Sequence, residues 1–133
     1  MVYLLDTNVI IRFLVGDHEK HLEKIIVIFK DIEKAKVQVE ILEGVLMEAF
    51  FVLTKFYKIP KNNVINDLKM ILNFNGVINS NKTILYEALN IIENRNIDFV
   101  DALICAKSKL QGFGKLSFDG DVKKMLKTSK LEI

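Results

Sequence analysis

Short apolar segments alternate with longer helix-like segments along this chain of 133 residues, and this alternation restricts the possible folds. Residues 2–5 and 36–42 are short and rich in β-branched or other apolar side chains, as strands are. Each is followed by a segment in which apolar residues recur with the period of a helix. Strands that alternate with helices favour a parallel sheet with helices on both faces. The sequence therefore predicts one α/β domain over residues 1–133.

The same patterns predict the order of the elements. The expected strands are residues 2–5, 36–42, 76–79 and 115–118, with 131–133 as a last edge strand. The expected helices run from Asn8 onward and over residues 16–34, 44–58, 61–74, 81–95, 98–111 and 121–128. Asp17 and Asp98 are candidate N-caps, and Pro60 suits the first turn of the helix that follows it. Gly112 and Gly114 follow the end of the helix expected over residues 98–111.

Composition indicates a cytoplasmic protein that has a partner. Half of the residues are apolar and the mean hydropathy is +0.24, so we expect a partner to cover some apolar surface. No apolar run reaches the roughly 18 residues of a membrane span. The chain reaches an acid at position 6 without a basic leader, which does not fit a signal peptide. A single cysteine, Cys105, allows no internal disulfide.

Four acidic residues interrupt apolar segments, where a charge is costly unless something compensates it. Asp6 and Asp119 each follow an expected strand, so both belong to the carboxyl edge of the sheet, where ligands bind in such folds. Glu48 lies inside the apolar helix expected over residues 44–58, and Asp101 precedes an apolar helix body. The sequence predicts that all four are at least partly buried.

Each acid also has an ordinary structural explanation. Asp6 or Asp119 can cap a helix. Asp101 suits a first helical turn, where the helix dipole favours an acid, and Glu48 can pair with Lys55. Taken together, four clustered carboxylates would repel one another unless a cation binds among them. Oxygen ligands without cysteine or histidine favour Mg²⁺ or Mn²⁺.

Four stretches around these acids resemble the motifs of the PIN-domain nucleases, specifically the VapC-like toxins of toxin–antitoxin pairs. They are LLDTNVIIRFL with Asp6, LMEAFFVLTKFYKIPK with Glu48, DFVDALICAK with Asp101, and LSFDGDV with Asp119. In the second stretch Glu40 and Glu43 are alternative acids. Glu48 is preferred because VLTKFYKIP then keeps the family's register. The fourth stretch has Ser117 where the family more often has threonine.

The resemblance implies an αβα sandwich around a parallel sheet and cleavage of RNA that depends on Mg²⁺ or Mn²⁺. It implies that the four motif acids are catalytic and bind the metal. Asn8 and Ser117 would orient these carboxylates through hydrogen bonds. The resemblance further implies a homodimer and a small antitoxin protein as partner.

The chemistry of these residues agrees with that activity. A cation held by Asp6 and Asp101 would lower the pKa of a bound water and stabilise charge on the scissile phosphate. Glu48 would hold a second ion or orient the water, and Asp119 would complete the ligands. The formal net charge is +2, and 19 basic residues against the 13 other acids would leave +6, which suits RNA. The candidate RNA-binding cations are Arg12, Lys123 and Lys124.

Other functions fit the sequence less well or remain as alternatives. Phosphotransferases of the haloacid-dehalogenase type need a second aspartate where Asn8 stands, and receiver modules need adjacent acids near Asp6. The chain has neither of the common glycine-rich nucleotide-binding motifs. An RNA-processing nuclease without an antitoxin and an inactive RNA-binding scaffold both remain possible functions.

Three features lie outside the acidic residues. His18 and His21 are three residues apart on an expected helix, but zinc would need two further ligands. The apolar surroundings of Cys105 predict a buried, inert thiol. The stretch EAFFVLTKFY is apolar around more than one helix face, so we expect core contacts together with a dimer contact or an antitoxin groove.

Overall fold

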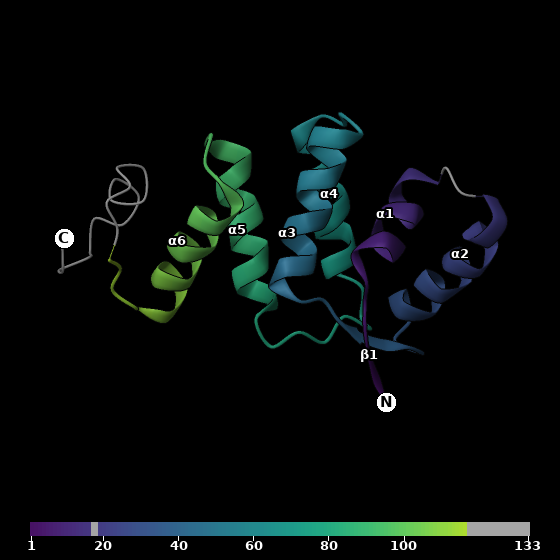
Figure 1. The fold of residues 1–133 in the computed structure, drawn as a ribbon. Coiled ribbons are helices and arrows are strands. Elements are labelled where there is room, and N and C mark those ends of the chain that lie inside the picture. Colours follow the sequence, from purple (N-terminus) through teal and green to yellow (C-terminus); the bar gives the residue numbers. More distant parts are fainter. Residues whose placement is uncertain (17–18, 117–133) are drawn as a thin grey trace. The chain divides into compact units, whose positions relative to one another are not determined.

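The computed structural model describes residues 1–16 and 19–116 and divides the chain into two compact units (Figure 1). The first unit comprises Met1–Ser80, and the second comprises Asn81–Ile133. Each unit has its own helices and its own buried side chains. That residues 1–133 form a single domain stays a prediction.

The described part of the first unit contains two short strands, four α-helices and one π-helical segment. In chain order these are β1 (Val2–Leu4), α1 (Thr7–Val15), α2 (Glu19–Glu33), β2 (Gln38–Glu40), α3 (Glu43–Phe51), η1 (Val52–Phe56) and α4 (Lys61–Leu72). The described part of the second unit contains α5 (Lys82–Asn94) and α6 (Phe99–Gln111). The helix expected over residues 44–58 is therefore divided into α3 and η1.

β1 and β2 form a parallel pair, as the sequence predicts. The register pairs Val2 with Gln38, Tyr3 with Val39, and Leu4 with Glu40. On its other side, β2 contacts the chain through an isolated parallel bridge from Val39 to Val77. α1 follows β1 and α3 follows β2, so both helices begin at the carboxyl edge of the sheet.

β2 is shorter than the sequence predicts because the end of α2 uses the backbone groups that precede it. The amides of Lys36 and Val37 donate to the carbonyl oxygen of Asp31, at 2.8 and 3.2 Å. Residues 36 and 37 therefore close the helix, and β2 begins only at Gln38. The described residues 115–116 are not in a strand, and the expected elements beyond residue 116 lie outside the described residues.

Gly76 lies where the chain passes close to both the end of α2 and β2. Its amide donates to the carbonyl of Ile32 and its carbonyl accepts from the amide of Val39, both at 2.7 Å. A Cβ atom at this position would overlap the carbonyl oxygens of Ile32 and Val37, so only glycine fits. Because these contacts hold Gly76, the strand expected over residues 76–79 is reduced to one bridge.

The helix that begins as α3 widens into η1 at Val52. The Tyr57 amide donates to the carbonyl of Val52, five residues earlier, at 3.1 Å. The Thr54 hydroxyl donates to the carbonyls of Phe50 and Phe51, at 2.8 and 3.3 Å. A hydroxyl bonded to the preceding turn often bends a helix. Thr54 therefore lies where the chain changes from α-helical to π-helical geometry.

The helices of the first unit pack around a continuous apolar interior. α1 contacts α2 and α3, and α3 contacts α4. The ring of Phe13 on α1 stacks on that of Phe29 on α2, with ring centroids 4.0 Å apart. The largest fully buried side chains of this unit are Ile10, Phe29, Ile32, Ile41, Leu46, Leu53, Ile65, Leu68, Ile71 and Leu72.

In the second unit α5 packs against α6. Cys105 is buried with 1% of its surface exposed, which confirms its prediction as a core residue. α6 ends at Gly112, whose φ of 68° lies in the left-handed region that glycine adopts easily. Within the described residues, the helices are too short or too polar to span a membrane.

The side chain of Asn79 continues the sheet beyond its last backbone pair. Its Oδ1 accepts a hydrogen bond from the Ile41 amide at 2.8 Å, and its Nδ2 donates to the Ile41 carbonyl at 2.6 Å. Asn79 is 9% exposed and Ile41 is fully buried. The carboxamide thus satisfies both backbone groups of Ile41 and fixes the segment that leads into α3.

Replacing Asn79 with alanine should lower the free energy of unfolding by about 2 kcal/mol or more, because a buried backbone group without a partner costs roughly 1–3 kcal/mol. Asn62→Ala, at an exposed position of α4, is the matched control. It should be neutral or slightly stabilising, because alanine favours the helix. Urea denaturation measures both. Equal stability of the Asn79 variant and the wild type would contradict the role given to this carboxamide.

Candidate functional site

Asp6 is the first residue after β1 and its extension, at the point where α1 begins. Its backbone is extended (φ −84°, ψ 149°), and its carbonyl accepts hydrogen bonds from the amides of Val9 and Ile10, at 3.1 and 3.4 Å. Asp6 therefore occupies the N-cap position, yet its side chain makes no capping hydrogen bond. The structure therefore does not support the ordinary explanation of Asp6, in which its carboxylate caps α1.

The prediction that Asp6 is buried is wrong. Its neighbours Leu5 and Thr7 are 7% and 5% exposed, whereas Asp6 itself is exposed. The chain turns from strand to helix at this residue, so the side chains on either side enter the core while the carboxylate points outward. Within the described residues this carboxylate makes no hydrogen bond or ion pair. Its oxygens are therefore available to a ligand.

Glu48 is also exposed, which corrects the prediction of partial burial. Leu46 and Ala49 of α3 are 1% and 0% exposed and face the core. Glu48 shares the other side of the helix with Gly44 and Phe51, both exposed, at spacings of four and three residues. Among the described residues its carboxylate pairs with no cation, so the alternative explanation, an ion pair with Lys55, is not observed.

The two alternative acids of this region lie on other parts of the chain. Glu40 is the last residue of β2 and is half-buried, opposite Leu4 of β1. Glu43 is the first residue of α3 and is exposed. An acid in a first helical turn has a favourable interaction with the helix dipole, so Glu43 has a structural reason to be there. The choice of Glu48 stays a prediction.

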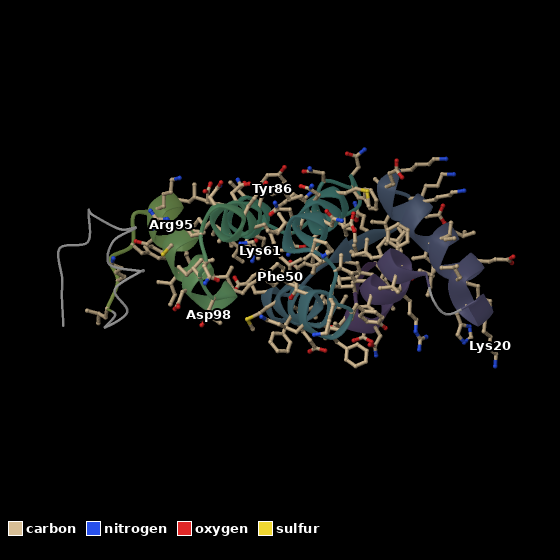
Figure 2. The ribbon with its side chains drawn as sticks, turned by 90° about the horizontal axis from the view of Figure 1, so that it is seen from above. Lys20, Phe50, Lys61, Tyr86, Arg95 and Asp98 are labelled. Atoms are coloured by element: carbon tan, nitrogen blue, oxygen red, sulfur yellow. The ribbon has the colours of Figure 1, made fainter. Side chains whose placement is uncertain are left out.

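Asp101 lies in the first turn of α6 in the second unit and is half-buried. Ala102 and Cys105 next to it are buried, which explains the partial burial that the sequence predicts. Asp98 precedes the helix at the N-cap position, as expected, with an extended backbone (φ −67°, ψ 151°), and it is labelled in Figure 2. Its side chain makes no capping hydrogen bond.

Several predicted residues cannot be compared with the structure. Asp119, Ser117, Lys123 and Lys124 lie outside the described residues, as do Asp17 and His18. Asn8 is exposed in the first turn of α1, Arg12 is half-buried one turn later, and His21 is exposed on α2. Over residues 1–16 and 19–116, no three acids, histidines or cysteines come together as metal ligands.

The chemistry of the donors nevertheless suits a hard divalent cation. Asp6 and Glu48 offer carboxylate oxygens that no described group uses, and both belong to the first unit. Asp6 precedes α1 and Glu48 lies on α3, and these two helices contact each other. Mg²⁺ and Mn²⁺ prefer such oxygen ligands. These two acids fit such an ion, and Asp101 and Asp119 remain the predicted further ligands.

The sequence does not predict a hollow that lies between α1 and the α3–η1 helix. Asn8 and Ile11 of α1 line it together with side chains of the α3–η1 helix, namely Phe51, Val52, Lys55, Phe56 and Tyr57. Its volume is about 530 Å³. The sequence signal is the cluster of aromatic residues in EAFFVLTKFY, for which the sequence predicts core contacts and a dimer contact or antitoxin groove.

Comparisons with known proteins identify the family. The family model of the PIN domain matches residues 3–127. The chain is 30% identical over 126 residues to a VapC ribonuclease of Aquifex aeolicus (strain VF5), which covers 92% of this chain and 90% of that protein. No solved structure matches the chain. The family match confirms the predicted α/β sandwich with a parallel sheet. The chain belongs to the PIN-domain family and is VapC-like.

Proposed function

We propose that this protein is a metal-dependent endoribonuclease and the toxin of a toxin–antitoxin pair. Membership of the PIN-domain family and similarity to a VapC ribonuclease support this function. The observation that carries it is Asp6, whose carboxylate is exposed at the carboxyl edge of the parallel sheet and bonds to no other group among the described residues. Ligands bind at this edge in open α/β sheets.

The proposed mechanism assigns a role to each motif acid. Asp6, Glu48, Asp101 and Asp119 would hold Mg²⁺ or Mn²⁺, which when bound activates water and offsets charge on the scissile phosphate. The backbone bonds at the start of α1 hold Asp6 in place.

Other side chains would orient these acids and bind the substrate. Asn8, two residues after Asp6, and Ser117, two before Asp119, would donate hydrogen bonds that orient the carboxylates. Arg12, Lys123 and Lys124 would bind RNA phosphates.

The proposed setting is the cytoplasm, where the protein would act as a homodimer and be held inactive by a small antitoxin protein. The similarity to a VapC ribonuclease supports an antitoxin partner. The exposed apolar side chains of the first unit, such as Val27 and Ile28 on α2, agree with the expected protein contacts.

Purified protein should cleave single-stranded and structured RNA when Mg²⁺ or Mn²⁺ is present, and a chelator should stop the reaction. The products of labelled RNA on a denaturing gel measure the activity, and added Mn²⁺ after chelation should restore it. Cleavage that persists in chelator would contradict the metal mechanism. If no RNA of a broad panel is cleaved, the inactive RNA-binding scaffold becomes the better function.

Asp6→Asn and Asp101→Asn should each abolish cleavage while the fold stays as stable as the wild type or becomes more stable without metal. Clustered carboxylates repel one another in the absence of a cation, and neutralising one relieves that repulsion. Asp31→Asn on α2 is a control that should keep full activity. Thermal melts without metal, together with activity assays, distinguish a metal ligand from a structural residue. A loss of about 1 kcal/mol or more with activity retained would instead indicate a structural role such as a cap.

Glu48→Gln should lose most of the activity, whereas Glu43→Gln and Glu40→Gln should stay near the wild type. Five residues separate Glu43 from Glu48, which is about 140° around a helix, so both cannot face the same site. The loss at Glu48 should exceed the roughly 10–100-fold effect of removing a residue that only supports a ligand. Cleavage rates under single-turnover conditions measure it. If Glu43→Gln abolishes cleavage while Glu48→Gln cleaves normally, the acid of the second motif is Glu43 and not Glu48.

A further inference from the structure

Exposed aromatic side chains gather where α3 continues into η1. Phe51 is 61% exposed and Phe56 is 76% exposed, and the rings of Phe56 and Tyr57 meet edge to face with centroids 5.2 Å apart. The same helix buries Ala49 and Leu53, at 0% and 1% exposure, on its core side. Packing of the core therefore does not require Phe51 or Phe56, and their large apolar surfaces remain open to a ligand.

These rings line a hollow that also carries polar groups. Lys55 and Asn8 stand in its wall together with Phe51, Phe56 and Tyr57, and no acid is among the described residues that line it. The hollow thus offers flat aromatic faces, one positive charge and one amide. This combination resembles the surfaces on which proteins bind single-stranded nucleic acid, where bases stack on rings and cations meet the backbone.

The π-helical turn brings this set of side chains together. The hydrogen bond from the Tyr57 amide to the Val52 carbonyl spans five residues, and the Thr54 hydroxyl bonds to the carbonyls of Phe50 and Phe51. Widened turns of this kind often occur at functional sites. Here the widened segment contains Lys55 and Phe56, the cation and the most exposed ring of the hollow.

The hollow lies next to Glu48 on the helix surface, and its α1 wall begins two residues after Asp6. Asn8 follows Asp6 by two residues at the start of α1. Phe51 and Val52 follow Glu48 by three and four residues, and such residues are neighbours on a helix surface. A nucleotide whose phosphate lies at Glu48 can therefore place a neighbouring base against these rings.

We propose that this hollow is a stacking site for an unpaired base of a single-stranded RNA substrate, next to the phosphate that is cleaved. The proposal rests on the ribonuclease function and adds the class of RNA. RNA uses the rings, Lys55 and Asn8 together, because a base stacks while the backbone and base edges meet the cation and the amide. A purely apolar protein segment would instead cover Lys55 and Asn8 without giving them polar partners, which is costly. A base inside a duplex is already stacked and cannot enter.

The test measures RNA affinity separately from cleavage. The full chain is titrated in chelator into a fluorescein-labelled single-stranded RNA of twelve nucleotides, and anisotropy gives Kd. Phe51→Ala and Phe56→Ala should each weaken binding by roughly five- to 150-fold, the range for loss of one stacked base. Phe56→Tyr should bind like the wild type because it keeps a ring. Phe56→Leu should bind as weakly as the alanine variant although it keeps apolar surface.

Phe113→Ala is the matched control, because Phe113 is 55% exposed and lies outside the hollow. It should leave Kd unchanged, and a duplex of the same sequence should compete poorly. Circular dichroism melts check that the variants are folded, as expected for exposed side chains. If both hollow variants bind RNA as tightly as the control, the stacking site is wrong. The same holds if they lose only the binding of a protein partner, which would make the hollow a protein groove.

The outcomes for this site and for the proposed function can be told apart. Metal-dependent cleavage with unchanged RNA affinity in the Phe51 and Phe56 variants would overturn the stacking site and leave the ribonuclease function intact. Absence of cleavage together with weakened RNA affinity in those variants would support the stacking site and overturn the enzymatic function. Weakened binding together with a parallel fall in kcat/KM would support both.

Discussion

The double hydrogen bond between the Asn79 carboxamide and the backbone of Ile41 is the contact on which the functional edge of the first unit depends. β2 ends at Glu40 and α3 begins at Glu43, so the chain has only two residues in which to leave the sheet. Because Asn79 satisfies both polar groups of the buried Ile41, this connection needs no further strand. The start of α3 is thereby fixed, and with it the positions of Glu48 and of the rings on η1.

The same strand also positions Asp6. The amide of Leu5 donates to the carbonyl of Glu40 at 3.2 Å, which extends the pairing of β1 with β2 up to the residue before Asp6. The carbonyl of Asp6 then accepts the first hydrogen bonds of α1. The backbone of Asp6 thus links the last sheet hydrogen bond, at Leu5, to the first turn of α1, while its carboxylate makes no capping bond. Among the described residues only the backbone of Asp6 makes structural contacts, so its carboxylate can bind a ligand without loss of a structural bond.

The helical spacing of apolar residues and the residues typical of helix ends predicted the helices well, because both are local properties of the chain. Gly112 ended α6 as expected, and Asp98 preceded it. The strands were predicted too long, because the amides of Lys36 and Val37 close the end of α2 on the Asp31 carbonyl. The bond from the Gly76 amide to the Ile32 carbonyl is tertiary and leaves no local pattern in the sequence. Burial of Asp6 and Glu48 was wrong for a related reason. An apolar run shows that a segment touches the core, but the direction of a single side chain depends on the turn and on the helix face.

The hollow could not be predicted, because it depends on a change of helix pitch and on the packing of α1 against α3. Its chemistry nevertheless separates it from the other exposed apolar surface of the first unit. Val27 and Ile28 on α2 are aliphatic and offer no flat face on which a base can stack. Phe51 and Phe56 offer such faces, and Lys55 adds a charge of the sign that RNA requires. The exposed apolar side chains of the described residues therefore have at least two chemical kinds, and the aromatic kind that lines the hollow begins at Phe51, one helical turn after Glu48.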